Sequence, residues 1–523
     1  MGMGTGRAHS SRRPFLPFLI FLGVTLVLWL RFGRSSSGSG GSGGSCDLNA
    51  YSKDMTTELN LKHCKLTELP SIISQFKVLK KLDVSHNALT DLPTLPASLE
   101  VLFCLGNPFE DIPVSVTQLP ALHMLSFKSC RLKTLGAKPL PSTLDWLILT
   151  DNELVSLPAD FGYLTMMRKL MLANNRLTSL PESMSNMGEL ELLRLANNQL
   201  SAIPPFILSL PKLTWLAVAG NPCIAPAPAR ASLATVSMAS VRLGDKLGEG
   251  TSSVVRKGEW HGQTVAVKVY KAQLSSDGKN IDEVRASCAV DHPNVLRWLG
   301  YVEEGASTVG QAHATASDGG GAWRLVGVLE WAPGFRSLGK PPSMTTITRD
   351  TYPEKTAFSG DEIVAIAKGI AAALAHLHER GLSHGDVYAH NILWRRGGGD
   401  GGDGDDDGGR PHPHQRRAPS DGAAATAKLA DFGAAFFYGA GSADAPRYEQ
   451  MEQRAYGLLL EELLARHDGT TPHLLGNVRA VADAATMALP EERPGFAKLL
   501  RMLTEKRKGR ELRRPRGTFG RAF

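Results

Sequence analysis

Cysteine is scarce in this chain, and its spacing fits no metal site. Six cysteines are spread over 523 residues, with no Cys-x-x-Cys pair and no cluster of cysteine with histidine. Small secreted scaffolds held by disulfides are far richer in cysteine, and zinc sites need closely spaced thiol or imidazole ligands. Both classes are therefore excluded. Cys64, Cys104 and Cys130 occupy fixed positions of a repeat, so we expect buried free thiols in a reducing compartment.

Long apolar runs are also missing. A predominantly apolar stretch without charge, residues 15–30, is flanked by Arg13 and Arg31. As a helix it would span ~24 Å, less than the ~30 Å hydrocarbon core of a bilayer, although the flanking arginines could reach the interface. We expect residues 1–34 to form a hydrophobic membrane anchor, followed by a Ser/Gly-rich linker at 35–54. A cleaved targeting segment and a wrongly assigned start are the alternatives.

Acidic residues are absent from the first 46 positions and outnumbered by basic ones in 505–523. The formal charges of these two ends are +5 and +6, whereas the net charge of the whole chain is only +7. The stretch between them is therefore mildly acidic. A nucleic-acid-binding domain would carry its basic residues on a folded surface. We therefore expect no nucleic acid partner, and we interpret 505–523 as a basic tail.

From position 56 onward the chain repeats a pattern of 20 to 23 residues, and the copy at 190–200 reads Leu-x-x-Leu-x-Leu-x-x-Asn-x-Leu. The units begin at Thr56, Leu79, Leu99, Leu122, Leu144, Met167, Leu190 and Leu213. One column is always Asn or Cys: Cys64, Asn87, Asn107, Cys130, Asn152, Asn175, Asn198 and Asn221. This resembles the leucine-rich repeat family, which implies an α/β solenoid over residues 55–226.

Side chains between the inward leucines would point out of the concave face of such a solenoid. Their mixture of charged and aromatic groups fits a protein partner. They include Lys80, Lys81, Asp83, Glu100, Phe103, His123, Ser126, Asp145, Trp146, Arg168, Lys169, Glu191, Arg194 and Trp215.

A second set of motifs lies in the C-terminal half. His384-Gly385-Asp386 is followed by Asn391, and Asp431-Phe432-Gly433 comes further downstream. This order fits phosphoryl transfer from Mg-ATP. One carboxylate takes the proton of the attacking hydroxyl, while an amide and a second carboxylate hold Mg²⁺.

Residues upstream complete a nucleotide site. A Gly-rich loop at 247–255 would let backbone N–H groups approach phosphates, and Lys268 ends an alternating strand thirteen residues later. Glu283, on a helical stretch, is the natural partner of Lys268, and the buried strand 325–330 leads into an adenine-pocket hinge. The predicted ATP contacts are Leu247, Gly248, Glu249, Gly250, Ser253, Val255, Ala266, Lys268, Glu330 and Ala332.

Together these motifs resemble the eukaryotic protein kinases, and residues 56 to about 504 are similar to the leucine-rich-repeat protein kinases of the tyrosine-kinase-like branch. The resemblance implies an α+β two-lobed protein kinase fold at 241–504, after a linker at 227–240, with low-complexity insertions near 305–323 and 397–426. It implies ATP and Mg²⁺ as cofactors. Catalytic roles are implied for Asp386, Lys268 and Glu283, and metal ligation for Asn391 and Asp431.

The chain departs from the kinase pattern around its catalytic loop. Gly385 replaces the arginine that grips a phosphorylated activation loop, and Tyr388 replaces the lysine typical of Ser/Thr kinases. Only about two dozen residues separate Gly433 from the next predicted helix near Tyr456. We therefore expect that phosphorylation of this short segment does not switch activity.

We predict an ATP-dependent protein kinase, serine/threonine-specific rather than tyrosine-specific, that recognises protein partners through its repeats. A pseudokinase scaffold and a small-molecule phosphotransferase are the alternatives, since His-Gly-Asp also resembles enzymes that phosphorylate aminoglycosides and choline. No apolar run separates repeats from kinase. Both would lie on the same side of a single-pass anchor, the cytosolic side because the kinase needs ATP. Organelle targeting and a soluble cytoplasmic protein are the other possibilities.

Overall fold

The computed structural model describes residues 46–136, 138–226, 235–250, 252–304, 324–397, 425–439 and 441–505. The predicted anchor at 15–30, the insertion at 305–323, most of that at 397–426 and nearly all of the basic tail lie outside them. Within the described residues, no helix combines the length and the apolar composition needed to cross a bilayer.

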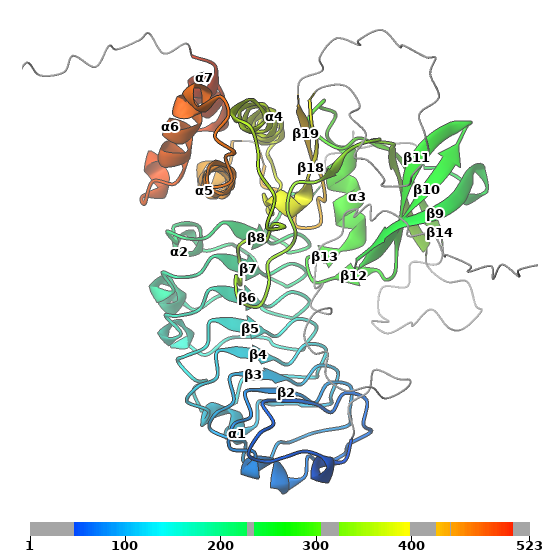
Figure 1. Ribbon diagram of the computed structural model, residues 1–523. Helices are drawn as coiled ribbons and strands as arrows, with labels where there is room; N and C mark the ends of the chain where they lie inside the picture. The colour runs from blue at the N-terminus through cyan, green and yellow to red at the C-terminus, as the bar shows by residue number, and fades with distance from the viewer. Residues whose placement is uncertain are drawn as a thin grey trace, which may run out of the picture.

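Short parallel strands, one from each repeat unit, build the N-terminal half. They pair in chain order from β1 to β8 in an eight-stranded sheet (Figure 1). The register joins the central leucines of neighbouring strands, such as Leu59 with Leu82 and Leu82 with Leu102, and these leucines are buried. The strands are β1 (Glu58–Asn60), β2 (Lys81–Asp83), β3 (Val101–Phe103), β4 (Met124–Ser126), β5 (Trp146–Ile148), β6 (Lys169–Met171), β7 (Leu192–Arg194) and β8 (Trp215–Ala217).

Short helical turns connect these strands around the shared leucine core. They are η1 (Leu48–Ala50), η2 (Ser71–Gln75), α1 (Val114–Thr117), η3 (Phe161–Tyr163), η4 (Glu182–Asn186) and α2 (Pro205–Leu208). One repeat cannot bury its own leucines, so the core exists only because neighbouring units stack.

The asparagine column joins each unit to the previous one. The side-chain N–H groups of Asn152 donate to the carbonyls of Leu149 and Phe127, both at 2.9 Å, and its oxygen accepts the Leu132 N–H at 3.1 Å. Asp151, just before it, has a φ of 60°, and the residue before the column residue has positive φ in all eight units. This recurring turn lets the amide satisfy backbone groups that would otherwise be buried without a partner.

The cysteine prediction was wrong for the first unit. Cys46 and Cys64 form a disulfide across a sequence separation of 18 residues. Cys64 stands in the first repeat, where no earlier unit covers its column, so the N-terminal segment can reach it. Cys104 and Cys130 are buried free thiols as expected. Since disulfides persist in oxidising compartments, the thiols no longer favour a reducing one.

The small lobe of the second half is a five-stranded antiparallel sheet in the order β14-β15-β11-β10-β9. Helix α3 (Asn280–Cys288) contacts this sheet and follows a short hairpin, β12 (Leu274–Ser275) and β13 (Gly278–Lys279). The five strands are β9 (Val241–Glu249), β10 (Ser253–Trp260), β11 (Gln263–Tyr270), β14 (Trp298–Glu304) and β15 (Arg324–Glu330). The single turn η5 (Met238–Ser240) precedes them.

The large lobe is mainly helical. Ser359 and Glu362 form a capping box at the start of α4 (Gly360–His378), whose buried face carries apolar residues at helical spacing. The other helices are α5 (Ala445–Leu464), α6 (Leu475–Ala485) and α7 (Phe496–Thr504), with turns η6 (Ala389–Asn391), η7 (Pro472–Leu474) and η8 (Pro490–Glu492). Short strands complete it: β16 (Arg336–Ser337), β17 (Leu382–Ser383), β18 (Ile392–Arg395), β19 (Thr426–Leu429) and β20 (Phe436–Phe437).

The kinase half rests on the C-terminal end of the solenoid. The loop from β16 to α4 runs down beside β6–β8, and the β12–β13 hairpin lies next to the same strands (Figure 1). The leucine core of the repeats continues into the large lobe through Phe436, Tyr448 and Met451. The two halves therefore share buried apolar surface.

Candidate active site

A hollow opens between the small-lobe sheet and the large lobe. One end is apolar, with Val255, Ala266 and Leu329, and the other carries Lys268 and Asp431. An apolar pocket that ends in a few charged groups suits a nucleotide, whose base is flat and whose phosphates are anionic. Of the predicted ATP contacts, Val255, Ala266, Lys268 and Glu330 line this hollow.

Lys268 is held by two carboxylates. Its Nζ lies 2.5 Å from Oε1 of Glu283 and 3.6 Å from Oδ1 of Asp431. Burial by itself lowers the pKa of Lys268, but Asp431 and Glu283 outweigh it and raise that pKa. The lysine therefore stays charged at the polar end of the hollow, where phosphate oxygens would lie.

Two oxygens without hydrogen-bond partners lie on the loop that contains Asp386 and Asn391, five residues apart in sequence. Asn391 donates a side-chain N–H to the backbone carbonyl of Asp386 at 3.1 Å, which fixes the amide. Among the described residues, Oδ1 of Asn391 and Oδ1 of Asp386 are buried and have no hydrogen-bond partner. A buried acceptor without a donor is costly, so both atoms suit a ligand proton or a cation.

Asp431 supplies the second carboxylate from a strained backbone. Its φ of 59° lies in the left-handed region, which a non-glycine residue adopts at a cost and which is common at functional sites. Burial would raise the pKa of Asp431, but Lys268 beside it lowers that pKa overall. The group is therefore a charged carboxylate.

The oxygens of Asn391 and Asp431 fit Mg²⁺ as a bound cation. Mg²⁺ prefers oxygen ligands and takes most of them from phosphates and water rather than from protein.

Contacts outside the hollow hold the Gly-rich loop in place. Gly248 pairs with Val255 across β9 and β10, and the N–H of Gly250 donates to the Ser253 carbonyl at 2.9 Å. The carboxylate of Glu249 pairs with Lys271 at 2.6 Å, so this predicted contact tethers the loop and does not line the hollow. Leu247 packs in the cluster that contains Val255 and Ala266.

At the hinge, the side chain of Glu330 is already engaged. It accepts from Lys428 at 2.8 Å and from the Arg297 N–H at 2.9 Å. Ala332 is buried in the same cluster as Ala266. Leu296 and Trp298 also line the hollow, and the sequence pattern did not identify them because no motif marks the segment before β14 or its first residue.

Residues of the repeats cover the catalytic loop, an arrangement that no sequence motif indicated. Trp215 forms a backbone bridge with Asp386, and the Leu216 N–H donates to the Gly385 carbonyl at 3.1 Å. The hydroxyls of Thr214 and Tyr388 lie 3.3 Å apart. In this arrangement Asp386 is 7% exposed.

The charges around Asp386 belong to both halves of the chain. Arg194, fully buried, places its Nε 2.8 Å from Oδ1 of Asp277 on the β12–β13 hairpin. Burial raises the pKa of Asp386 to about 7, and burial together with Arg194 lowers the pKa of Lys169 to about 7. Both groups are thus shifted by their removal from water.

The prediction of a free concave face needs correction at its C-terminal end. Glu191 accepts from Thr348 at 2.6 Å and Arg349 at 3.0 Å, and Arg168 donates to Thr348 at 3.1 Å. The face is therefore occupied there by the second half of the same chain. Its N-terminal positions stay at least partly exposed: Lys80, Lys81, Asp83, Glu100, Phe103 and His123.

Comparisons with known proteins agree with the prediction of a repeat region followed by a kinase domain. Residues 241–456 match the protein kinase domain family, and residues 142–200 and 165–222 match the leucine rich repeat family. The Rust resistance kinase Lr10 of Triticum aestivum is 27% identical over 170 residues, which is 32% of this chain and 23% of the relative. The RAF proto-oncogene serine/threonine-protein kinase of Xenopus laevis is 24% identical over 165 residues, or 30% of this chain and 21% of the relative.

The chain thus spans less than a quarter of the length of these curated relatives. Among solved structures, a leucine-rich repeat protein of Leptospira interrogans is 29% identical, covers 31% of this chain and 48% of its own, and has a TM-score of 0.27.

Proposed function

Because the chain joins leucine-rich repeats to a protein kinase domain, we propose that it transfers the γ-phosphoryl group of ATP to serine or threonine hydroxyls of a protein. The observation that carries this proposal is the buried set of Lys268, Glu283 and Asp431 at the polar end of the hollow. A lysine fixed in this way neutralises phosphate oxygens without having to be ordered when ATP binds.

The other residues then take roles that their positions allow. Asp386 orients the substrate hydroxyl and accepts its proton. Asn391 and Asp431 hold Mg²⁺, which when bound neutralises charge on the phosphates. The backbone of the Gly-rich loop covers the phosphates, and Val255, Ala266 and the segment around Glu330 and Ala332 surround the base.

The test is phosphate transfer by the full chain from labelled Mg-ATP to mixed protein and peptide substrates. We expect transfer that is lost in Asp386→Asn and in Lys268→Met. Thermal stabilisation by a non-hydrolysable ATP analogue should survive the first substitution and weaken in the second. Undiminished transfer by both variants would show that the site is wrongly assigned.

A scaffold role without catalysis is the second candidate, and the burial of Asp386 under the repeats favours it. In that case nucleotide would bind and stabilise the chain, but no substrate would be phosphorylated. Transfer to a metabolite such as an amino sugar or an amino alcohol, with none to peptides, would instead indicate a small-molecule phosphotransferase.

For the partner surface, we retain only the open N-terminal part of the concave face. Lys80, Lys81 and Glu100 there are charged, and Phe103 adds an aromatic group, a mixture that suits the binding of a protein partner.

We also retain residues 15–30 as a proposed single-pass anchor with both domains on one side. The need for ATP is now the sole ground for placing that side in the cytosol, because the Cys46–Cys64 disulfide removes the thiol argument.

A further inference from the structure

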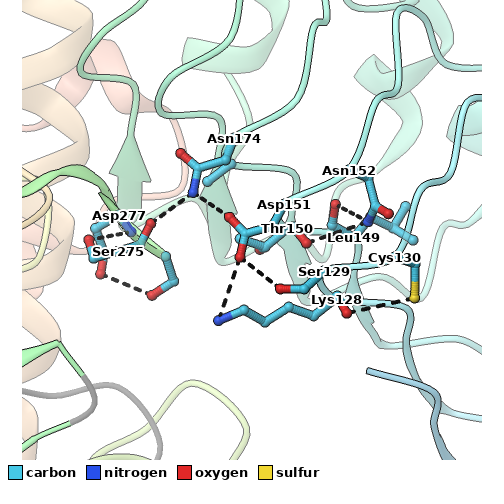
Figure 2. Close-up of polar contacts among 12 residues, drawn as sticks. Lys128, Ser129, Cys130, Leu149, Thr150, Asp151, Asn152, Asn174, Ser275 and Asp277 are labelled. Carbon is cyan, nitrogen blue, oxygen red and sulfur yellow. Dashed lines mark hydrogen bonds and ion pairs between the residues drawn. The ribbon is translucent and has the colours of Figure 1, made fainter. Parts of the chain in front are cut away.

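Specific polar contacts join the two halves of the chain. Asn174 donates to the Ser275 carbonyl at 3.0 Å and to Asp151 at 2.6 Å, which links the turns of neighbouring repeat units to the β12–β13 hairpin (Figure 2). Together with the Arg194–Asp277 pair, this fixes the hairpin to the concave face. We call the concave positions Arg168, Lys169, Asn174, Glu191, Arg194, Thr214 and Trp215 the docked face.

The departures of the catalytic loop from the kinase pattern lie against this docked face. Gly385 has a φ of 75°, and a Cβ there would lie 2.6 Å from the carbonyl oxygens of both Leu216 and Ala434. A side chain here would therefore meet one backbone oxygen of the repeats and one of its own half. Tyr388, in the place of the usual lysine, packs its ring 5.4 Å from that of Trp215 and contacts Thr214. The loop and the repeats are therefore fitted to each other.

Docking closes the side of the site that a substrate hydroxyl must reach. The hydroxyl has to come within hydrogen-bond distance of the Asp386 carboxylate. That carboxylate is buried, its backbone pairs with Trp215, and Arg194 and Lys169 are buried near it. The nucleotide side differs, because the hollow persists and Lys268 is already paired with Glu283.

We propose that the docked face is an autoinhibitory plug, which leaves the nucleotide hollow formed while it covers Asp386 against protein substrates. This rests on the proposed phosphoryl transfer and adds the control of it. The interface combines an apolar part, where Phe436, Tyr448 and Met451 join the leucine core, with the ion pairs of Glu191 and Arg194. The ion pairs are the contacts that a change of charge or a competing partner can weaken. A partner that competes for the docked face, or pulls the repeats away, would expose the catalytic loop.

The pair Glu191–Arg349 tests the plug away from the nucleotide. Neither side chain lines the hollow, and their oxygen and nitrogen lie 3.0 Å apart across the interface. In the full chain, Glu191→Arg and Arg349→Glu should each open the interface. Loss of a close charged contact shifts such an equilibrium by on the order of tenfold or more. Peptide phosphorylation should rise by about that factor in each variant, and the exchanged pair Glu191→Arg with Arg349→Glu should return it toward the original rate.

Arg176→Glu is the matched control. Arg176 lies on the repeats in an ion pair with Glu153, and its substitution reverses a charge as the interface substitutions do. Hydrogen exchange of residues 382–392 provides a readout independent of activity, and it should speed up in the two single variants alone.

Each result has a separate meaning. Transfer that falls in the single variants, with exchange faster, would overturn the plug and make the repeats a support for the catalytic loop. Transfer and exchange that stay unchanged would overturn the docking itself. Faster exchange with no transfer in any variant would refute the proposed kinase function, and the plug with it.

Discussion

The replacement of Gly385 by alanine gives a direct measure of how closely the repeats approach the catalytic loop. In the docked arrangement the new methyl group meets two backbone oxygens, one from the repeat residue Leu216 and one from Ala434. Backbone atoms cannot swing aside as the end of a side chain can, so the loop or the repeats must move.

The expected size follows from two separate costs. A non-glycine residue in the left-handed region costs about 1–2 kcal/mol, and overpacking typically costs about 1–3 kcal/mol. Gly262 has a φ of 76° with no heavy atom within 4 Å of an added Cβ. Gly262→Ala therefore carries the first cost alone, and the difference between the two variants isolates the contact with the repeats and Ala434.

Hydrogen exchange of the Leu216 amide is the assay, because this N–H donates across the interface to the Gly385 carbonyl. An overpacking cost of about 1–3 kcal/mol corresponds to roughly 5- to 150-fold faster exchange, since each 1.4 kcal/mol is tenfold. We expect this acceleration in Gly385→Ala and none in Gly262→Ala. Equal exchange of the Leu216 amide in both variants would refute the close approach.

Two further predictions concern pH and the disulfide. Burial raises the pKa of Asp386 to about 7, and the base must be ionised to accept a proton, so transfer should rise with pH through about 7 in the parent chain. In Glu191→Arg the rise should move to lower pH. The same pKa difference makes docking stronger at low pH. Between about pH 4 and pH 7 the Asp386 carboxyl is protonated when docked and ionised when exposed to water, so docking weakens as the pH rises through this range. An unchanged profile in Glu191→Arg would contradict the burial argument. Separately, Cys46→Ser should destabilise the first repeat by about 3 kcal/mol, the value expected for a closed loop of roughly this size. Hydrogen exchange that becomes faster in Cys46→Ser, and only in residues 46–66, would show this loss of stability. Cys223→Ser is the control, and equal exchange rates of residues 46–66 in the two variants would refute the prediction.

The sequence by itself determined the parts whose information is local or repeated. The leucine column and the column of Asn or Cys recur with few exceptions, so stacking neighbours is the one way to bury them, and the solenoid follows. The sequence also predicted which residues line the hollow at Val255, Ala266, Lys268 and Glu330, because short motifs mark them. Trp298 and Leu296, which line the same hollow, were missed because no motif marks them.

Tertiary structure alone decided what faces the Asp386 carboxylate. Trp215 and Asp386 lie far apart in sequence, and the sequence predicts the first as an outward repeat residue and the second as a catalytic aspartate. Their pairing depends on the relative placement of two folded halves, which the shape and charge of whole surfaces determine and no local period encodes. The same holds for Arg194 with Asp277. The sequence did show Gly385, Tyr388 and the short segment after Gly433 as departures. The structure supplies a physical reason for the first two: backbone oxygens of Leu216 and Ala434 leave no room for a side chain at Gly385, and the Trp215 indole of the repeats packs against Tyr388.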